Sequence, residues 1–83
     1  MNNRLFARNL SLATNDELLR EAFKRFGTVT SAHVVLDRTT GASRGFGFVS
    51  FADSESAKQA MREMNGVTLD GRVLGVAEAR ERE

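Results

Sequence analysis

Aromatic rings and guanidinium groups are the side chains best suited to chemistry in this 83-residue sequence. All six aromatic residues are phenylalanine, and Phe46, Phe48 and Phe51 fall within one short segment. Seven of the twelve basic residues are arginines in strand-like or loop segments, although the net charge is only +1. Rings of this kind stack on other flat π systems, and guanidinium groups pair with anions. These residues therefore favour non-covalent binding over catalysis.

Covalent and metal chemistry have few possible residues here. The sequence contains no cysteine, which excludes a disulfide framework and a thiolate metal site, and His33 is its only histidine. A nucleophilic triad or a zinc site needs partner groups that this chain does not supply. We therefore predict that the chain is not an enzyme, with no catalytic residue, no metal and no cofactor.

Hydrophobic periodicity and turn signals indicate the elements that position these residues. The predicted strands cover residues 4–10, 29–37, 45–51 and 72–76. Two helices are predicted from apolar stripes at helical spacing, and the stripes consist of Leu18, Leu19, Ala22, Phe23 and Phe26, and of Ala57, Ala60, Met61 and Met64. The segment from Thr14 to Glu17 has the form of a capping box with Thr14 as the cap, and Asp53 or Ser54 caps the second helix.

Glycine-containing turns separate the predicted helices and strands. Gly27 is predicted to end the first helix in a left-handed conformation, and Asn65-Gly66 ends the second. Asp70-Gly71 lies between residues 67–69 and 72–76 and is a strong signal for a tight hairpin.

The order strand, helix, strand, strand, helix, strand predicts an α+β fold. It is a two-layer βαββαβ sandwich of the ferredoxin-like type, in which a four-stranded antiparallel sheet carries both helices on one face. Eighty-three residues suffice for one domain. We expect a domain over residues 4–79, a short N-terminal tail (1–3) and a charged C-terminal tail (80–83).

Side-chain alternation along the strands decides which residues face away from the helices. Val49 and Phe51 form the better core pair, which leaves Phe46 and Phe48 on the open face, and the first strand adds Phe6 there. The residues predicted to point inward are Leu5, Ala7, Ala32, Val34, Leu36, Leu74 and Val76, and those predicted to point outward are His33, Val35, Asp37, Gly75 and Ala77. The alternative, with Phe46 and Phe48 in the core, stays open on pattern alone. Exposed rings beside arginines suit unstacked nucleic-acid bases and their phosphates.

The segment Arg44–Phe51 (RGFGFVSF) resembles the RNP octamer of the RNA recognition motif family at every constrained position. Upstream, residues 5–10 (LFARNL) resemble the companion hexamer of that family. The resemblance covers about residues 4 to 79 and implies the βαββαβ fold with single-stranded RNA as the ligand. It implies that Phe6 and Phe48 each stack on a base, that Phe46 packs against sugars or between bases, and that Arg44 pairs with a phosphate.

Three features depart from the family's pattern. Ala7 is smaller than the usual aliphatic residue, and Arg8 stands where many members have glycine and is expected to strengthen binding. Gly75 and Ala77 leave the last strand without base-edge hydrogen bonds, which predicts weak sequence specificity. The predicted RNA-binding residues are Phe6, Phe46, Phe48, Arg44, Arg8, Asn9, His33, Arg38 and Arg80. For Arg80, which alternates with acidic residues, a solvated tail remains the alternative.

Other functions remain possible for such a fold. Single-stranded DNA is an alternative ligand, because stacking is blind to the sugar. Peptide-binding members of the family generally lack the sheet aromatics, which are present here. The topology also hosts copper chaperones, which need paired cysteines, and acylphosphatases, for which Arg8-Asn9 is a weak candidate without a phosphate loop. We further expect a monomer without membrane association, intracellular in the nucleus or cytoplasm and not secreted, acting in RNA processing, stability or translation control.

Overall fold

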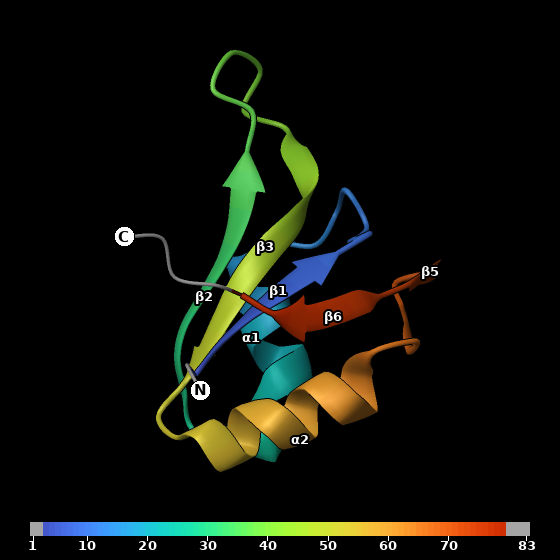
Figure 1. Cartoon of the computed structure of the whole chain (residues 1–83). Coiled ribbons are helices and arrows are strands. Elements are labelled where there is room, and N and C mark those ends of the chain that lie inside the picture. Colours follow the sequence, from blue (N-terminus) through green and yellow to red (C-terminus); the bar gives the residue numbers. More distant parts are fainter. Residues whose placement is uncertain (1–2, 80–83) are drawn as a thin grey trace.

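Residues 3–79 are described by a computed structural model, in which one antiparallel sheet carries two helices on a single face (Figure 1). The elements in chain order are β1 (Arg4–Arg8), α1 (Asp16–Phe23), the 3₁₀ turn η1 (Lys24–Phe26), β2 (Val29–Leu36), β3 (Ser43–Phe51), α2 (Ser54–Met64), β4 (Thr68–Leu69), β5 (Arg72–Val73) and β6 (Gly75–Glu78). The predicted two-layer βαββαβ fold is confirmed.

The strands of the main sheet lie in the order β2-β3-β1-β6, so β1 and β3 form its centre. Their register pairs Leu5 with Val49 and Phe6 with Phe48. On its other side, β1 pairs with β6, where Arg8 lies opposite Gly75. The two segments that resemble the family's hexamer and octamer, distant in sequence, are therefore neighbours in the middle of the sheet.

The core lies between the sheet and the helices, as side-chain alternation predicts. Its buried residues are Leu5, Ala7, Leu10, Leu19, Phe23, Val29, Val34, Val49, Phe51, Ala57, Ala60, Met64, Leu74 and Val76. Val49 and Phe51 are almost fully buried, and the rings of Phe51 and Phe23 are 6.5 Å apart between centroids. The alternative arrangement, with Phe46 and Phe48 in the core, is therefore wrong.

Two leucines predicted to be buried are exposed instead. Leu36 is 55% exposed because the register of β2 against β3 shifts between Val34 and Leu36, which interrupts the alternation. Leu18 is 46% exposed, whereas its neighbour Leu19 is fully buried. Consecutive residues on a helix point about 100° apart, so a helix that buries Leu19 and Phe23 turns Leu18 toward its flank.

The cap of α1 also differs from the prediction. Asn15, and not Thr14, is the N-cap, and its side-chain oxygen accepts a hydrogen bond from the backbone N–H of Leu18 at 2.8 Å. Thr14 is buried, and its hydroxyl donates to the carboxylate of Asp70 at 3.1 Å. At the other end, Gly27 stops the helical segment with φ 155° and ψ −169°, which is not the predicted left-handed helical conformation but is equally specific to glycine.

The predicted hairpin forms β4 and β5, and it is fastened to the loop after β1. Asp70 and Gly71 have φ values of 52° and 83°, as a tight turn between two strands requires. Besides the Thr14–Asp70 bond, the Asn9 amide donates to the carbonyl of Val73 at 2.7 Å. Arg72 donates to the carbonyl of Leu10 at 3.5 Å. We call these three contacts the hairpin clasp.

Candidate functional site

Three phenylalanine rings lie together on the sheet face that the helices leave uncovered. The ring centroids of Phe6 and Phe48 are 5.5 Å apart, and those of Phe6 and Phe46 are 5.6 Å apart. The rings are tilted against each other by 45° and 56°, which is a favourable arrangement for aromatic pairs. All three are half-buried, so part of each ring faces solvent. We call Phe6, Phe46 and Phe48 the aromatic platform.

β3, the strand that carries Phe46 and Phe48, requires glycine at position 47. Gly47 lies between Phe46 and Phe48 on the buried face, where a Cβ would collide with the carbonyl oxygen of His33 and lie 3.1 Å from the Cα of Val34. Glycine at this position lets β2 pack closely against β3. The close pairing holds the two flanking rings on the open face.

Two arginines lie against the rings of the platform. The guanidinium carbon of Arg4 is 4.5 Å from the centroid of Phe48, and that of Arg44 is 5.8 Å from the centroid of Phe46. Both distances fall within the range of cation–π interactions. Arg44, predicted to pair with a phosphate, thus lies beside the rings. Arg4 was not among the predicted site residues, although its place two residues before Phe6 put it on the same strand face.

Arg8 and Asn9 lie at the β6 side of the platform. Arg8 is exposed, and its Cα pairs with that of Phe46 on one side and Gly75 on the other. Asn9 has φ 62°, and its amide is held by the clasp to β5. Both residues line a hollow of about 450 Å³ together with Asn65 and Gly75. The side chain of Asn9 lies at this edge and also makes a structural hydrogen bond to Val73.

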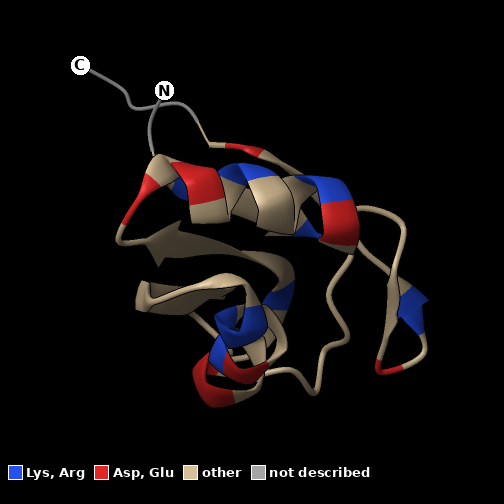
Figure 2. Ribbon diagram, turned by 90° about the horizontal axis from the view of Figure 1, so that it is seen from below, with Lys and Arg blue, Asp and Glu red and all other residues tan. Residues whose placement is uncertain are grey.

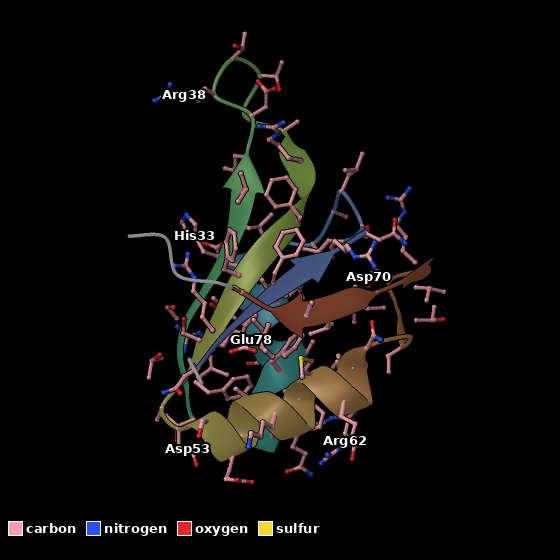
Figure 3. All side chains as sticks on the ribbon, in the orientation of Figure 1. His33, Arg38, Asp53, Arg62, Asp70 and Glu78 are labelled. Carbon is pink, nitrogen blue, oxygen red and sulfur yellow. The ribbon has the colours of Figure 1, made fainter. Side chains whose placement is uncertain are left out.

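Of the other predicted residues, His33 lies near the platform and Arg38 does not. His33 pairs with Phe48 in the register of β2 and β3, and its Nδ1 is 3.7 Å from a carboxylate oxygen of Asp16. Figure 3 shows Arg38 at the tip of the loop between β2 and β3, away from the centre of the sheet. Arg80 lies outside the described residues.

The loop that carries Arg38 is organised by Asp37. Its carboxylate accepts hydrogen bonds from the backbone N–H groups of Thr40 at 3.0 Å and Thr39 at 2.8 Å. These two bonds, the one from Thr40 first, hold the pKa of Asp37 below its usual value. Arg38 itself is exposed in this loop.

A second hollow, of about 760 Å³, lies at the opposite end of the platform. Its lining includes Arg4, Ser31, His33, Phe48 and Ser50. The two serines offer hydroxyl donors and acceptors beside an exposed ring edge. They were missed as site residues, although alternation placed Ser50 on the same face as Phe46 and Phe48.

The helical side of the molecule has a different character. Figure 2 shows Lys and Arg interleaved with Asp and Glu on both helices. Such a mixed surface is typical of solvated helices. Among residues 3–79 there is no group of three or more metal-ligating side chains, and no helix there is long and apolar enough to cross a membrane.

Comparison with known proteins identifies relatives along nearly the whole chain. A family model described as RNA recognition motif matches residues 5–75. The glycine-rich RNA-binding protein of Daucus carota is 51% identical over 79 residues, which make up 95% of this chain and 50% of that protein. The mitochondrial glycine-rich RNA-binding protein 4 of Arabidopsis thaliana is 51% identical over 82 residues, or 99% of this chain and 60% of that protein. The chain therefore spans about half the length of these relatives.

Solved structures share the fold closely. The crystal structure of RNA binding protein PG1 has a TM-score of 0.92 at 41% identity, covering 96% of both chains. A complex of the Sxl-lethal protein with RNA has a TM-score of 0.93 at 28% identity, covering 100% of this chain and 50% of that chain. Since the family model matches most of the sequence and the relatives align over almost all of it, the chain belongs to the RNA recognition motif family.

Proposed function

We propose that this chain binds single-stranded RNA on the aromatic platform, with one base stacked on Phe6 and one on Phe48. The observation that carries the proposal is the cluster of three solvent-facing rings at the centre of the uncovered sheet face, flanked by the guanidinium groups of Arg4 and Arg44. The relatives named as RNA-binding proteins and the structural neighbour solved with RNA support it.

The energetics of this arrangement favour unpaired nucleotides. A base that stacks on an aromatic side chain gains about 1–3 kcal/mol, and only an unstacked base can present its face to the ring. Phe46 lies beside Phe6, and we expect it to pack against sugars or between bases. Arg44 supplies a cation for a phosphate, and phosphate contacts hold the strand without selecting its sequence.

The proposal predicts that a Phe46→Ala/Phe48→Ala variant stays folded and loses most of its RNA affinity. Both rings are only half-buried and lie outside the core cluster, so their removal should leave the melting temperature nearly unchanged. Fluorescence anisotropy with a labelled single-stranded RNA and thermal unfolding by circular dichroism measure the two quantities.

A matched control is Leu18→Ala on α1, which removes a partly exposed apolar side chain (46% exposed) on the helical side of the molecule. This variant should keep both its affinity and its melting temperature. Undiminished affinity in the double variant would contradict the proposal. A large fall in its melting temperature would show that the two rings support the fold instead.

Single-stranded DNA is a second candidate ligand, because the observed rings offer stacking without a contact that reads the sugar. Competition between RNA and DNA oligonucleotides of the same sequence distinguishes the two. Equal displacement of the labelled RNA by both would make the chain a general single-strand binder. Preference for RNA would point to a contact with the 2′-hydroxyl.

The cellular setting is part of the proposal. We place the chain inside the cell as a monomeric, non-catalytic module, in the nucleus or cytoplasm, with a role in RNA processing, stability or translation control. The name of one relative places that protein in mitochondria, so imaging of the tagged full-length protein should score mitochondria as well.

A further inference from the structure

The side chain of Arg8 occupies the space above Gly75 on the last strand. A Cβ built on Gly75 would lie 2.6 Å from Nε of Arg8 and 2.9 Å from its Cγ and Cζ. The two residues are Cα partners in the register of β1 and β6, so the arginine lies across the strand beside it. The arrangement is possible because glycine has no side chain.

The position of Arg8 over Gly75 alters what is expected of β6, the last strand. The sequence alone suggests that Gly75 and Ala77 deprive the platform of base-edge contacts. In the structure, the guanidinium of Arg8 occupies the position that a side chain on β6 would take. The strand lacks donors of its own and receives them from its neighbour.

We propose that Arg8 recognises a guanine base at the β6 edge of the aromatic platform. The proposal rests on RNA binding by the platform. The guanidinium donates two parallel hydrogen bonds, and guanine presents two acceptors, N7 and O6, on one edge. Adenine offers one acceptor and one donor on the same edge, so an arginine, which only donates, matches it less well.

The surroundings of Arg8 fit a base. On one side its strand partner is Phe46, whose ring belongs to the platform. On the other side is the hollow of about 450 Å³, whose lining includes Asn9 and Asn65. Between residues 3 and 79 the ion pair of a lysine or arginine with a carboxylate joins Lys24 with Glu21, and it does not involve Arg8. Arg8 is exposed, and its guanidinium lies over Gly75 at the β6 side of the platform.

Binding of short RNAs that differ in one base tests the proposal. The probes are an oligouridine with a single central guanine and its counterparts with adenine, cytosine or uracil. A good bidentate contact discriminates by about 1–3 kcal/mol, so we expect the guanine probe to bind about 5- to 150-fold more tightly. Replacing guanine with 7-deazaguanine, which lacks N7, should remove most of the gain. Inosine keeps N7 and O6 and should retain it.

Three variants assign the preference to Arg8. Arg8→Lys keeps the charge but lacks the planar fork, so it should lose most of the preference for guanine and retain more of the affinity for oligouridine than Arg8→Ala does. Arg8→Ala should lose the preference together with part of its overall affinity. Gly75→Ala should also lose it, because the new Cβ displaces the guanidinium; Gly75 has no positive φ, so the fold should be retained.

Equal binding of the four probes by the wild type, or an unchanged guanine preference in Arg8→Ala, would overturn the inference while leaving RNA binding by the platform intact. Failure of the wild type to bind any probe would instead contradict the proposed function.

Discussion

The backbone of Asn9 has a φ of 62°, a conformation that most L-residues avoid and that asparagine tolerates. Its amide donates to the carbonyl of Val73 at 2.7 Å, which fastens the end of β1 to the hairpin. The hexamer resemblance predicts Asn9 as an RNA contact, but a single residue can satisfy a local conformation and a tertiary bond at the same time. Asparagine suits both requirements at this position.

We therefore predict that Asn9→Ala destabilises the domain by about 1–3 kcal/mol, because the variant loses a hydrogen bond and is strained at positive φ. Asn9→Gly loses only the hydrogen bond and should lose less. Urea unfolding followed by circular dichroism measures both changes. Equal losses in the two variants would contradict a role for the backbone conformation.

Side-chain faces are predicted correctly in some strands and helices and wrongly in others. Phe46, Phe48, Val49 and Phe51 were assigned to the correct faces because β3 follows strict alternation there. Leu36 was misassigned because a register shift is a property of two paired strands, and one strand's sequence does not reveal it. Thr14 was misassigned as a cap because its hydroxyl bonds to Asp70, which is distant in sequence.

The same limit applies to the candidate site. The rings and Arg44 could be predicted because they lie on two segments with recognisable patterns. The position of Arg8 above Gly75 could not be predicted, since it depends on the register between β1 and β6. Arg4 could have been found from its place on the same strand face as Phe6.

The hairpin clasp should stabilise the domain through the bond between Thr14 and Asp70. Thr14→Val keeps the shape of a buried side chain but removes the hydroxyl that bonds to Asp70. We expect a loss of about 1 kcal/mol in the free energy of unfolding. Asp70→Ala removes the other partner, and the double variant should lose less than the sum of the single losses. Strictly additive losses in chemical denaturation would show that the two side chains do not interact.

At the scale of the whole molecule, the two faces of the sandwich differ in charge arrangement. The helices carry interleaved acidic and basic residues (Figure 2). On the uncovered sheet face, by contrast, Arg4 and Arg44 lie beside the rings. Long-range attraction of a polyanion should therefore involve the sheet face, and the helical face should contribute little.

The salt dependence of RNA binding tests this asymmetry. Each phosphate neutralised on a single strand contributes about 0.7 to the slope of log affinity against log salt concentration. Arg44→Gln should reduce the slope by about that amount, whereas the matched control Lys58→Gln on α2 should leave it unchanged. An equal effect of the two variants would mean that the whole molecule, and not one face, attracts RNA.

The strand order β2-β3-β1-β6 also determines when the sheet and its RNA-binding face can be completed during synthesis of the chain. β1 is the first strand of the described residues, yet one of its two partners, β6, is the last. The rings of Phe6, Phe46 and Phe48 belong to β1 and β3, and this centre of the sheet lacks one neighbour until β6 arrives. Nascent chains that lack β6 would therefore expose an unpaired edge of β1, and Arg8 should reach its position over Gly75 only after β6 has left the ribosome.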